Sequence, residues 1–195
     1  SCTIAFNASQ EILSAFSNGA PLGEQASIGK GLDTGDNGRF LRLWYETPIN
    51  STKWFPCQKG GQFRKWYGNN EFVIDWEHDG ASLKNFPKAN LRNQKNYFKE
   101  GLTWTRISSA VTAFRYFPSG HIFESTGPCY FPSSGKPSDS LGFLNSQVAR
   151  QILTFLAPTM DFQSGHISGL PSTRNDTSRS GATVEECNGI AKIDW

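Results

Sequence analysis

Two stretches of the chain repeat apolar residues at the three- and four-residue spacing that is typical of an amphipathic helix. The shorter stretch, residues 8–17, can begin at an N-cap formed by Asn7 and end at the pair Asn18-Gly19. The longer stretch, residues 139–156, ends before Pro158, which disfavours helical backbone at the residue before it. The apolar residues on its predicted face are Leu141, Leu144, Val148, Ile152 and Phe155. We expect the longer stretch to be a single helix packed on the core.

Between these stretches, runs of β-branched and aromatic residues are separated by turn residues, which indicates short strands. The predicted strands are residues 24–31, 39–46 and 71–76, and a β-hairpin formed by residues 111–117 and 121–124 around Pro118-Ser119-Gly120. Residues 31–38 and 80–96 are rich in Gly, Asn and Lys and predict long polar loops. The prediction is an α+β fold, a β-rich domain with long polar loops and a few packed helices.

The composition fits one folded domain. Hydrophobic residues make up 37% and aromatic residues 13% of the 195 positions, which is enough for one sizeable core. The Ser-, Thr- and Arg-rich residues 172–183 have the composition of a flexible linker. We therefore divide the chain into a leading helix at 1–20, a folded domain at 21–171, the linker at 172–183 and the start of a further helical segment at 184–195.

The sequence carries no pattern of export or membrane insertion. No run reaches the ~18 apolar residues of a spanning helix, and residues 1–6 do not have the regions of a signal peptide. Four cysteines, Cys2, Cys57, Cys129 and Cys187, are too far apart for a C-x-x-C zinc site. We interpret them as reduced thiols of a cytoplasmic protein without a membrane partner. The missing initiator methionine indicates a fragment of a longer protein.

Positive charge is concentrated in one part of the chain. Residues 84–115 contain seven Lys and Arg residues against one acidic residue, Glu100, although the net charge of the whole chain is only +2. Such a segment suits a polyanion, because each phosphate contact releases counterions from a nucleic acid. It also suits a solvated loop, and charge alone leaves both interpretations open.

Motifs of known catalytic chemistry are missing from this sequence. It contains no G-x-S-x-G, P-loop or H-E-x-x-H pattern, and His78, His121 and His166 are widely separated. The alternating carboxylates at 75, 77 and 79 could bind a cation, but they suit a solvated turn better. No nucleophile stands beside a base, so we predict neither catalytic nor metal-binding residues and favour a binding module.

Five motifs in a fixed order carry a family resemblance. They are Gly-Leu-Asp-Thr-Gly-Asp-Asn-Gly-Arg-Phe-Leu-Arg-Leu-Trp-Tyr from residue 31, Lys-Trp-Phe-Pro from 53 with Lys-Gly-Gly-Gln-Phe-Arg-Lys-Trp-Tyr-Gly-Asn from 59, Tyr-Phe-Lys-Glu-Gly-Leu-Thr-Trp from 97, Leu-Gly-Phe-Leu-Asn-Ser from 141, and Pro-Thr-Met-Asp-Phe-Gln-Ser-Gly-His-Ile from 158. Together they resemble the C-terminal region of the PglX-type adenine-specific DNA methyltransferases of BREX phage defence, from about residue 20 onward. Thr-Gly-Asp-Asn and Gly-Phe-Leu-Asn-Ser also resemble type IIG restriction-modification enzymes.

The resemblance implies a target-recognition domain that binds double-stranded DNA at a specific sequence. It implies an additional domain, upstream in the parent protein, that binds S-adenosylmethionine and carries Asn-Pro-Pro-Tyr for N6-adenine transfer. Neither feature is present in this sequence, so we expect no cofactor and no methyl transfer from this chain by itself. The expected partners are DNA, the methyltransferase domain, other BREX proteins and phage inhibitors that mimic DNA.

Candidate DNA contacts follow from these motifs, because phosphates attract Lys, Arg, hydroxyls and backbone N–H groups, whereas base edges attract Arg, Asn and Gln. The candidates are Thr34, Asn37, Arg39, Lys59, Gly60, Gly61, Arg64, Lys65, Tyr67, Arg106, Ser108, Ser109 and Gln163. Gly60 and Gly61 are chosen as backbone that can approach a phosphate closely. For Asp36 we favour capping of its own turn, and for Phe63 and Trp66 packing in the core. Turn and DNA contact stay open for Gln163.

Three alternatives compete with this interpretation. A carbohydrate-binding module would use Trp54, Trp66, Tyr67 and Trp104 as an aromatic platform, with binding that barely depends on salt. A small hydrolase would turn over substrate alone, but no residue spacing supports it. A separate specificity subunit would share the DNA-binding role, although the order of the motifs favours a domain fused to its methyltransferase.

Overall fold

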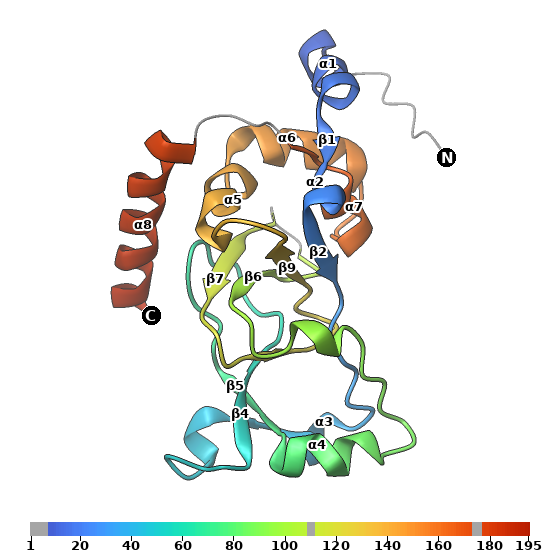
Figure 1. Ribbon diagram of the computed structural model, residues 1–195, viewed down its shortest axis with the longest axis vertical. Coiled ribbons are helices and arrows are strands. Elements are labelled where there is room, and N and C mark those ends of the chain that lie inside the picture. Colours follow the sequence, from blue (N-terminus) through green and yellow to red (C-terminus); the bar gives the residue numbers. More distant parts are fainter. Residues whose placement is uncertain (1–7, 109–111, 173–176) are drawn as a thin grey trace.

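The computed structural model describes residues 8–108, 112–172 and 177–195, and it is elongated, with most helices at one end (Figure 1). Two four-stranded sheets organise it into an upper and a lower lobe in the view of Figure 1. The upper sheet is antiparallel and has the order β2 (Ala26–Gly29), β9 (Cys129–Pro132), β6 (Gly101–Trp104), β7 (Phe114–Phe117). The lower sheet has the order β3 (Leu41–Leu43), β5 (Phe72–Asp75), β4 (Trp54–Gln58), β8 (Ile122–Phe123), and its β4–β8 pair is parallel.

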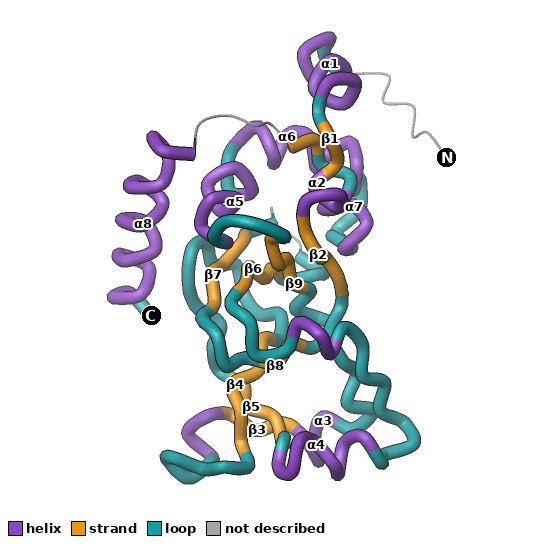
Figure 2. Tube along the Cα trace, in the orientation of Figure 1, coloured by secondary structure: helices purple, strands orange, loops and turns teal. Residues whose placement is uncertain are grey.

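Helices gather around the upper sheet, whereas the lower sheet carries short helical turns (Figure 2). The upper helices are α1 (Gln10–Asn18), α2 (Leu22–Gln25), α5 (Pro137–Leu144), α6 (Gln147–Leu156), α7 (Ser164–Ser168) and α8 (Thr177–Asp194). The lower lobe contains α3 (Asn37–Phe40), the 3-10 turn η1 (Trp44–Glu46) and α4 (Glu77–Lys84), and the turn η2 (Gln94–Asn96) follows in the chain. A two-stranded ladder joins β1 (Ala20–Pro21) to β10 (Pro171–Ser172). The predicted α+β class is confirmed.

Each face of the upper sheet packs against a different apolar cluster. Tyr130 of β9 packs with Trp104 and Phe114 in one apolar cluster, which we call the upper core. Its neighbours Cys129 and Phe131 pack with Phe123 in a second cluster, the lower core. This alternation follows from the two-residue period of a strand, which points successive side chains to opposite faces. The upper sheet is therefore covered by helices on one side and by the lower lobe on the other.

Several predicted elements agree with the structure. The strand expected at 71–76 is β5, and the strand expected at 24–31 is the shorter β2. The first helix ends at Asn18, where the Gly19 N–H donates to the Ala15 carbonyl, but it begins after Ser9. The predicted cap Asn7 lies outside the described residues.

The predicted hairpin around Pro118-Ser119-Gly120 is wrong. Its two strands, β7 and β8, belong to different sheets, because β7 pairs with β6 while β8 pairs with β4. The turn instead carries the chain from the upper to the lower sheet, with the Gly120 N–H donating to the Phe98 carbonyl at 2.9 Å. The strand predicted at 39–46 is also wrong over most of its length, since only β3 is extended there, between α3 and η1.

The single helix predicted at 139–156 is in fact two helices, α5 and α6. The break lies at Asn145 and Ser146, where the Ser146 Oγ caps α6 by accepting from the Ala149 N–H at 3.1 Å. The Asn145 amide turns to the sheet and binds both backbone groups of Phe114, accepting from its N–H at 3.0 Å and donating to its carbonyl at 2.9 Å. These tertiary bonds override the apolar periodicity that runs through the break.

The C-terminal segment is helical over a longer range than expected. Helix α8 begins at Thr177, so the flexible linker predicted at 172–183 is wrong from residue 177 onward. Residues 173–176 lie outside the described part of the chain. The cysteines that the structure describes, Cys57, Cys129 and Cys187, are free, and burial raises the thiol pKa of the first two above its ordinary value.

Candidate nucleic-acid interface

Three segments that are distant in sequence meet on one surface, which we call the three-loop face: residues 60–65, 105–108 and 160–163. The Gly61 N–H donates to the Thr105 Oγ at 3.0 Å, which joins the first segment to the second. The Ser108 N–H donates to the Met160 carbonyl at 3.0 Å, and an isolated bridge pairs Ile107 with residue 161, which joins the second to the third. Seven of the predicted contact residues belong to these segments: Gly60, Gly61, Arg64, Lys65, Arg106, Ser108 and Gln163.

Arg106, Asp161 and Gln163 form a hydrogen-bonded cluster on this face. Arg106 donates from Nε and Nη2 to the two carboxylate oxygens of Asp161 at 2.7 and 2.8 Å. The Gln163 Nε2 donates to the same carboxylate at 2.9 Å. The arginine hydrogen bonds hold the pKa of Asp161 below its ordinary value, and the Gln163 bond adds to this effect. The cluster fixes the position of the Arg106 fork and leaves the carbonyl oxygen of the Gln163 amide as an acceptor.

The lowered pKa of Asp161 gives a prediction for acid stability. The ionised form contributes stability above the pKa of an unfolded Asp, about 3.9, and this contribution is lost as the pH falls through the lower folded pKa. We expect Asp161→Asn to lose less unfolding free energy than the wild type between about pH 5 and pH 3. Urea unfolding at both pH values measures the difference, and an equal acid loss in the two proteins would contradict the prediction.

Exposed apolar side chains lie beside this cluster. Phe63, Ile107 and Met160 are 54%, 66% and 59% exposed, one from each of the three segments. The expectation of core packing is therefore wrong for Phe63, whereas Trp66 does pack against the upper core. Apolar side chains gathered on an exposed surface often mark a binding site.

The predicted phosphate cradle at Lys59, Gly60 and Gly61 already has internal partners. The Lys59 ammonium pairs with Glu124 at 3.5 Å, and the Lys59 side chain is only 19% exposed. A Cβ on Gly60 would lie 2.7 Å from the Thr126 carbonyl oxygen, so this backbone is packed closely against the protein itself. Glycine at 60 is thus explained by close packing, and its contact with DNA stays a prediction.

Arg64 and Tyr67 lie against the end of α8. The Arg64 guanidinium pairs with Asp194 at 3.0 Å and lies 4.8 Å from the centre of the Trp195 ring. The Lys192 ammonium lies 5.3 Å from the centre of the Tyr67 ring. Lys65 points elsewhere and donates to the Asn145 carbonyl at 3.3 Å. Of these three candidates, only Lys65 is a cation without a carboxylate partner among the described residues.

Thr34, Asn37 and Arg39 belong to the lower lobe rather than to the three-loop face. Thr34 is buried and donates to the Asn37 Oδ1 at 2.5 Å. The Arg39 guanidinium lies 5.0 Å from the centre of the Phe40 ring, while Asp36 caps α3 by accepting from the Arg39 N–H, as expected. Ser109 lies outside the described residues, and Ser108 has a further interaction beyond those named.

The basic segment 84–115 is partly neutralised by the fold. Lys84 pairs with Asp79, Arg92 with Asp33 and Arg106 with Asp161, while Arg115 is buried. Lys88, Lys95 and Lys99 are exposed, and none has a partner among the described residues.

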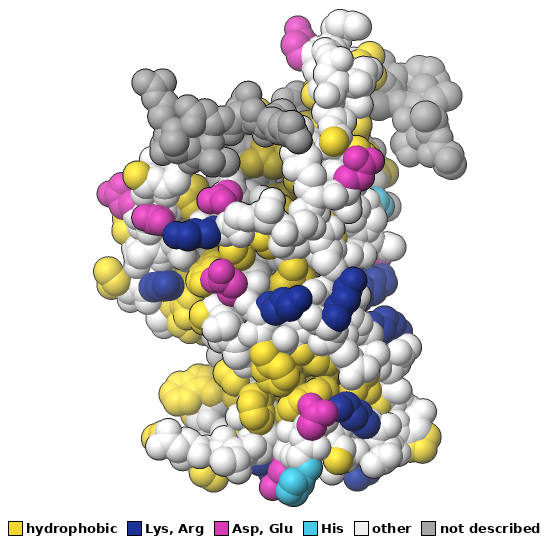
Figure 3. Space-filling view, viewed as in Figure 1, with side chains coloured by type: hydrophobic (Ala, Val, Ile, Leu, Met, Phe, Trp, Pro, Cys, Tyr) yellow, Lys and Arg dark blue, Asp and Glu magenta, His cyan; other side chains and the backbone are white. Residues whose placement is uncertain are grey.

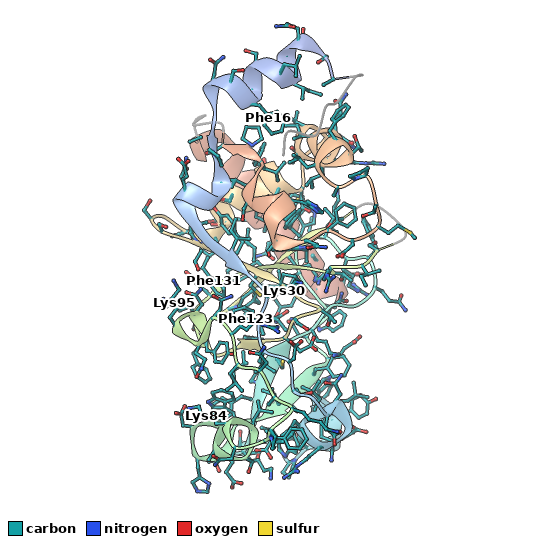
Figure 4. The ribbon with its side chains drawn as sticks, turned by 90° about the vertical axis from the view of Figure 1, so that its right-hand side faces the viewer. Phe16, Lys30, Lys84, Lys95, Phe123 and Phe131 are labelled. Atoms are coloured by element: carbon teal, nitrogen blue, oxygen red, sulfur yellow. The ribbon has the colours of Figure 1, made fainter. Side chains whose placement is uncertain are left out.

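Two of these lysines, Lys95 and Lys99, line an open groove of about 590 Å³. Lys and Arg side chains form a band across the middle of the surface in Figure 3. Figure 4 places Lys95 and Lys30 in that middle region, near Phe131 and Phe123. The predicted DNA contacts did not include Lys95 and Lys99, although the charge count of the segment did.

The structure gives little support to the alternative functions, a carbohydrate-binding module and a small hydrolase. Of the proposed sugar platform, Trp104 is fully buried and Trp66 packs on the core. The carboxylates at 75 and 77 pair with Lys53, and in the part of the chain that the structure describes no cluster of three His, Cys, Asp or Glu residues could hold a metal ion. Within the same ranges, no helix combines the length and apolar character that a membrane crossing requires.

Comparison with known proteins identifies two homologous methyltransferases. The chain is 36% identical over 204 aligned residues to the adenine-specific methyltransferase BrxX of Escherichia coli O9:H4 (strain HS), which covers 98% of this chain. It is 34% identical over 190 residues to the adenine-specific methyltransferase PglX of Lacticaseibacillus casei (strain Zhang), covering 87% of this chain. The chain is homologous to one part of the PglX-type adenine-specific methyltransferases.

This homology confirms the PglX-type resemblance that the five motifs predicted. The chain spans 16% of the length of each of these two relatives. No family model matches the sequence.

Proposed function

We propose that this chain is a DNA-recognition module of a PglX-type adenine-specific methyltransferase. The observation that carries the proposal is the three-loop face, which combines exposed Phe63, Ile107 and Met160 with the polar groups of Arg106 and Gln163. Apolar side chains can contact thymine methyl groups, and amide and guanidinium groups can bind base edges. Homology to methyltransferases that act on adenine makes duplex DNA the expected ligand.

Methyl transfer itself belongs, in this proposal, to another part of the longer protein. That part would bind S-adenosylmethionine and receive the adenine after it is flipped out of the duplex. The chain studied would hold the duplex and select the site, a task that needs shape, charge and hydrogen bonds but no cofactor. Other BREX proteins and phage inhibitors that mimic DNA are further proposed partners.

Fluorescence anisotropy of a labelled pool of duplex DNA tests the proposal. We expect the chain to bind, and the affinity to fall steeply as the salt concentration rises, because bound phosphates release counterions. Phe63→Ala combined with Ile107→Ala should weaken binding about tenfold at low salt, as expected for loss of central contacts of an interface.

A matched control removes Trp44 and Tyr45, which are 59% and 64% exposed and belong to the lower lobe. Replacing both by Ala should change the affinity less than about twofold, since contacts outside a binding surface contribute little. A DNA affinity that does not depend on the salt concentration, or equal losses of affinity in the two double variants, would overturn the proposal.

A further inference from the structure

The N-terminus of α6 opens into a hollow of about 60 Å³ on the edge of the three-loop face. We call it the α6 hollow, and it is lined by Phe63, Lys65, Thr112, Asn145, Ser146 and Arg150, among others. Phe63 lines the hollow and is also one of the exposed side chains of the three-loop face. The Gly-Phe-Leu-Asn-Ser motif ends here, because its last two residues form the break between α5 and α6.

The helix end presents positive charge to this hollow. Helix α6 has ten residues, and its Ser146 cap satisfies only the N–H of Ala149. The N–H groups of Gln147 and Val148, at the first two positions, have no partner within the helix. These groups and the helix dipole favour an anion at this end.

A buried hydroxyl without a partner lines the same hollow. Thr112 is 7% exposed, and its Oγ1 has no hydrogen-bond partner in the described part of the structure. A buried polar group that is left unpaired lowers the stability of the folded protein, because it has lost its hydrogen bonds to water. The hollow therefore contains a donor for which the described residues supply no acceptor.

Two cations, Lys65 and Arg150, line the hollow together with this hydroxyl, and no carboxylate is among the described residues that line it. Lys65 donates only to the Asn145 carbonyl, and Arg150 is exposed and without a partner among the described residues. Arg115 is buried and lines a second, smaller hollow that shares Phe63 and Thr112 as walls. Burial lowers the Arg115 pKa to about 10, so this guanidinium remains charged at neutral pH.

We propose that the α6 hollow binds one phosphate group of the DNA backbone, an inference that rests on the proposed function. Thr112 Oγ1 and the N–H groups of Gln147 and Val148 donate to the phosphate oxygens. Lys65 and Arg150 neutralise its charge from the rim. A phosphate held beside Phe63 fixes the register of the duplex, so that the three-loop face meets the base edges.

Arg150→Ala tests the charge of this site. We expect its DNA affinity to fall five- to tenfold at low salt, equally for all sequences in the pool, because a phosphate contact carries no sequence information. The slope of log affinity against log salt should become shallower by about 0.9, the value for one phosphate contact. Lys88→Ala, an equal loss of charge in an exposed residue of the lower lobe, should leave the slope unchanged.

Thr112→Val separates a binding role from a structural one. The variant keeps the shape of the side chain and removes the unpaired hydroxyl, so the unfolding midpoint should stay the same or rise while DNA affinity falls several-fold. Wild-type affinity and salt slope in both Arg150→Ala and Thr112→Val, in a chain that does bind DNA, would overturn the site and leave the proposed function standing.

A titration with inorganic phosphate tells whether the hollow binds free phosphate or only a phosphate of the DNA backbone. Amide NMR signals of Gln147 and Val148 should shift with phosphate in the wild type and much less in Arg150→Ala. If these signals shift while the chain binds no duplex DNA, the hollow binds free phosphate and the inference about the DNA backbone fails together with the proposed function. If neither phosphate nor DNA shifts them, no anion binds at the helix end and the inference fails.

Discussion

Replacing Gly31 by Ala is expected to lower the free energy of unfolding by about 3 kcal/mol or more, the range of severe overpacking. An added Cβ would lie 1.8 Å from the Phe123 carbonyl oxygen and 2.3 Å from its carbon, and neither backbone atom can rotate away. The backbone at Gly31 is held close to Phe123, because the Leu32 N–H donates to the same carbonyl at 3.0 Å. Gly31 follows β2, where the chain passes from the upper sheet to the lower core, so the substitution strains the connection between the lobes.

Gly38→Ala is the matched control for this substitution. Gly38 lies in α3, and its added Cβ would meet only the Asp36 Oδ1, at 3.6 Å. Alanine in a helix restricts the unfolded chain, so this variant should gain about 0.4–1 kcal/mol. Urea unfolding followed by circular dichroism compares the two, and similar midpoints for the two variants would contradict the packing argument.

Truncating Trp104 to Ala should cost about 3–5 kcal/mol, the usual range for a fully buried aromatic residue. Trp104 has no exposed surface, and its ring centre lies 5.5 Å from that of Phe114. Its indole N–H also donates to the Phe162 carbonyl at 2.7 Å. The side chain therefore supports the upper core and anchors the segment 160–163 of the three-loop face.

Two further tryptophan substitutions separate these roles. Trp104→Phe keeps most of the apolar contact but leaves the Phe162 carbonyl without this donor, so about 1–3 kcal/mol should be lost and DNA affinity should fall with it. Trp44→Ala, at a side chain that is 59% exposed, should stay within about 0.5 kcal/mol of the wild type. Thermal unfolding measures all three, and a loss in Trp44→Ala as large as in Trp104→Ala would contradict the assignment of the core.

The homology to PglX-type methyltransferases and much of the local structure could be predicted from the sequence. Five ordered motifs indicated PglX-type methyltransferases, and homology over most of the chain confirms this. The strand at β5 and the end of α1 at Asn18 follow from β-branched content and from a terminating glycine. The cap at Asp36 is equally local, because its acceptor binds an N–H three residues away. Such features depend on neighbours in sequence.

Pairings across the chain could not be predicted in this way. Local alternation indicates that β7 and β8 are strands, but it does not say that each joins a different sheet. Apolar spacing cannot show the break between α5 and α6, since it depends on hydrogen bonds from Asn145 to Phe114.

The same limit applies to the candidate site. The sequence by itself determined which segments are rich in cations, amides and glycine. Only the tertiary structure decided that Lys59 is neutralised by Glu124 and Arg106 by Asp161, while Lys65 and Arg150 have no carboxylate partner among the described residues. The reason is physical: an ion pair forms where the fold brings opposite charges within a few ångströms, and sequence separation does not determine that distance.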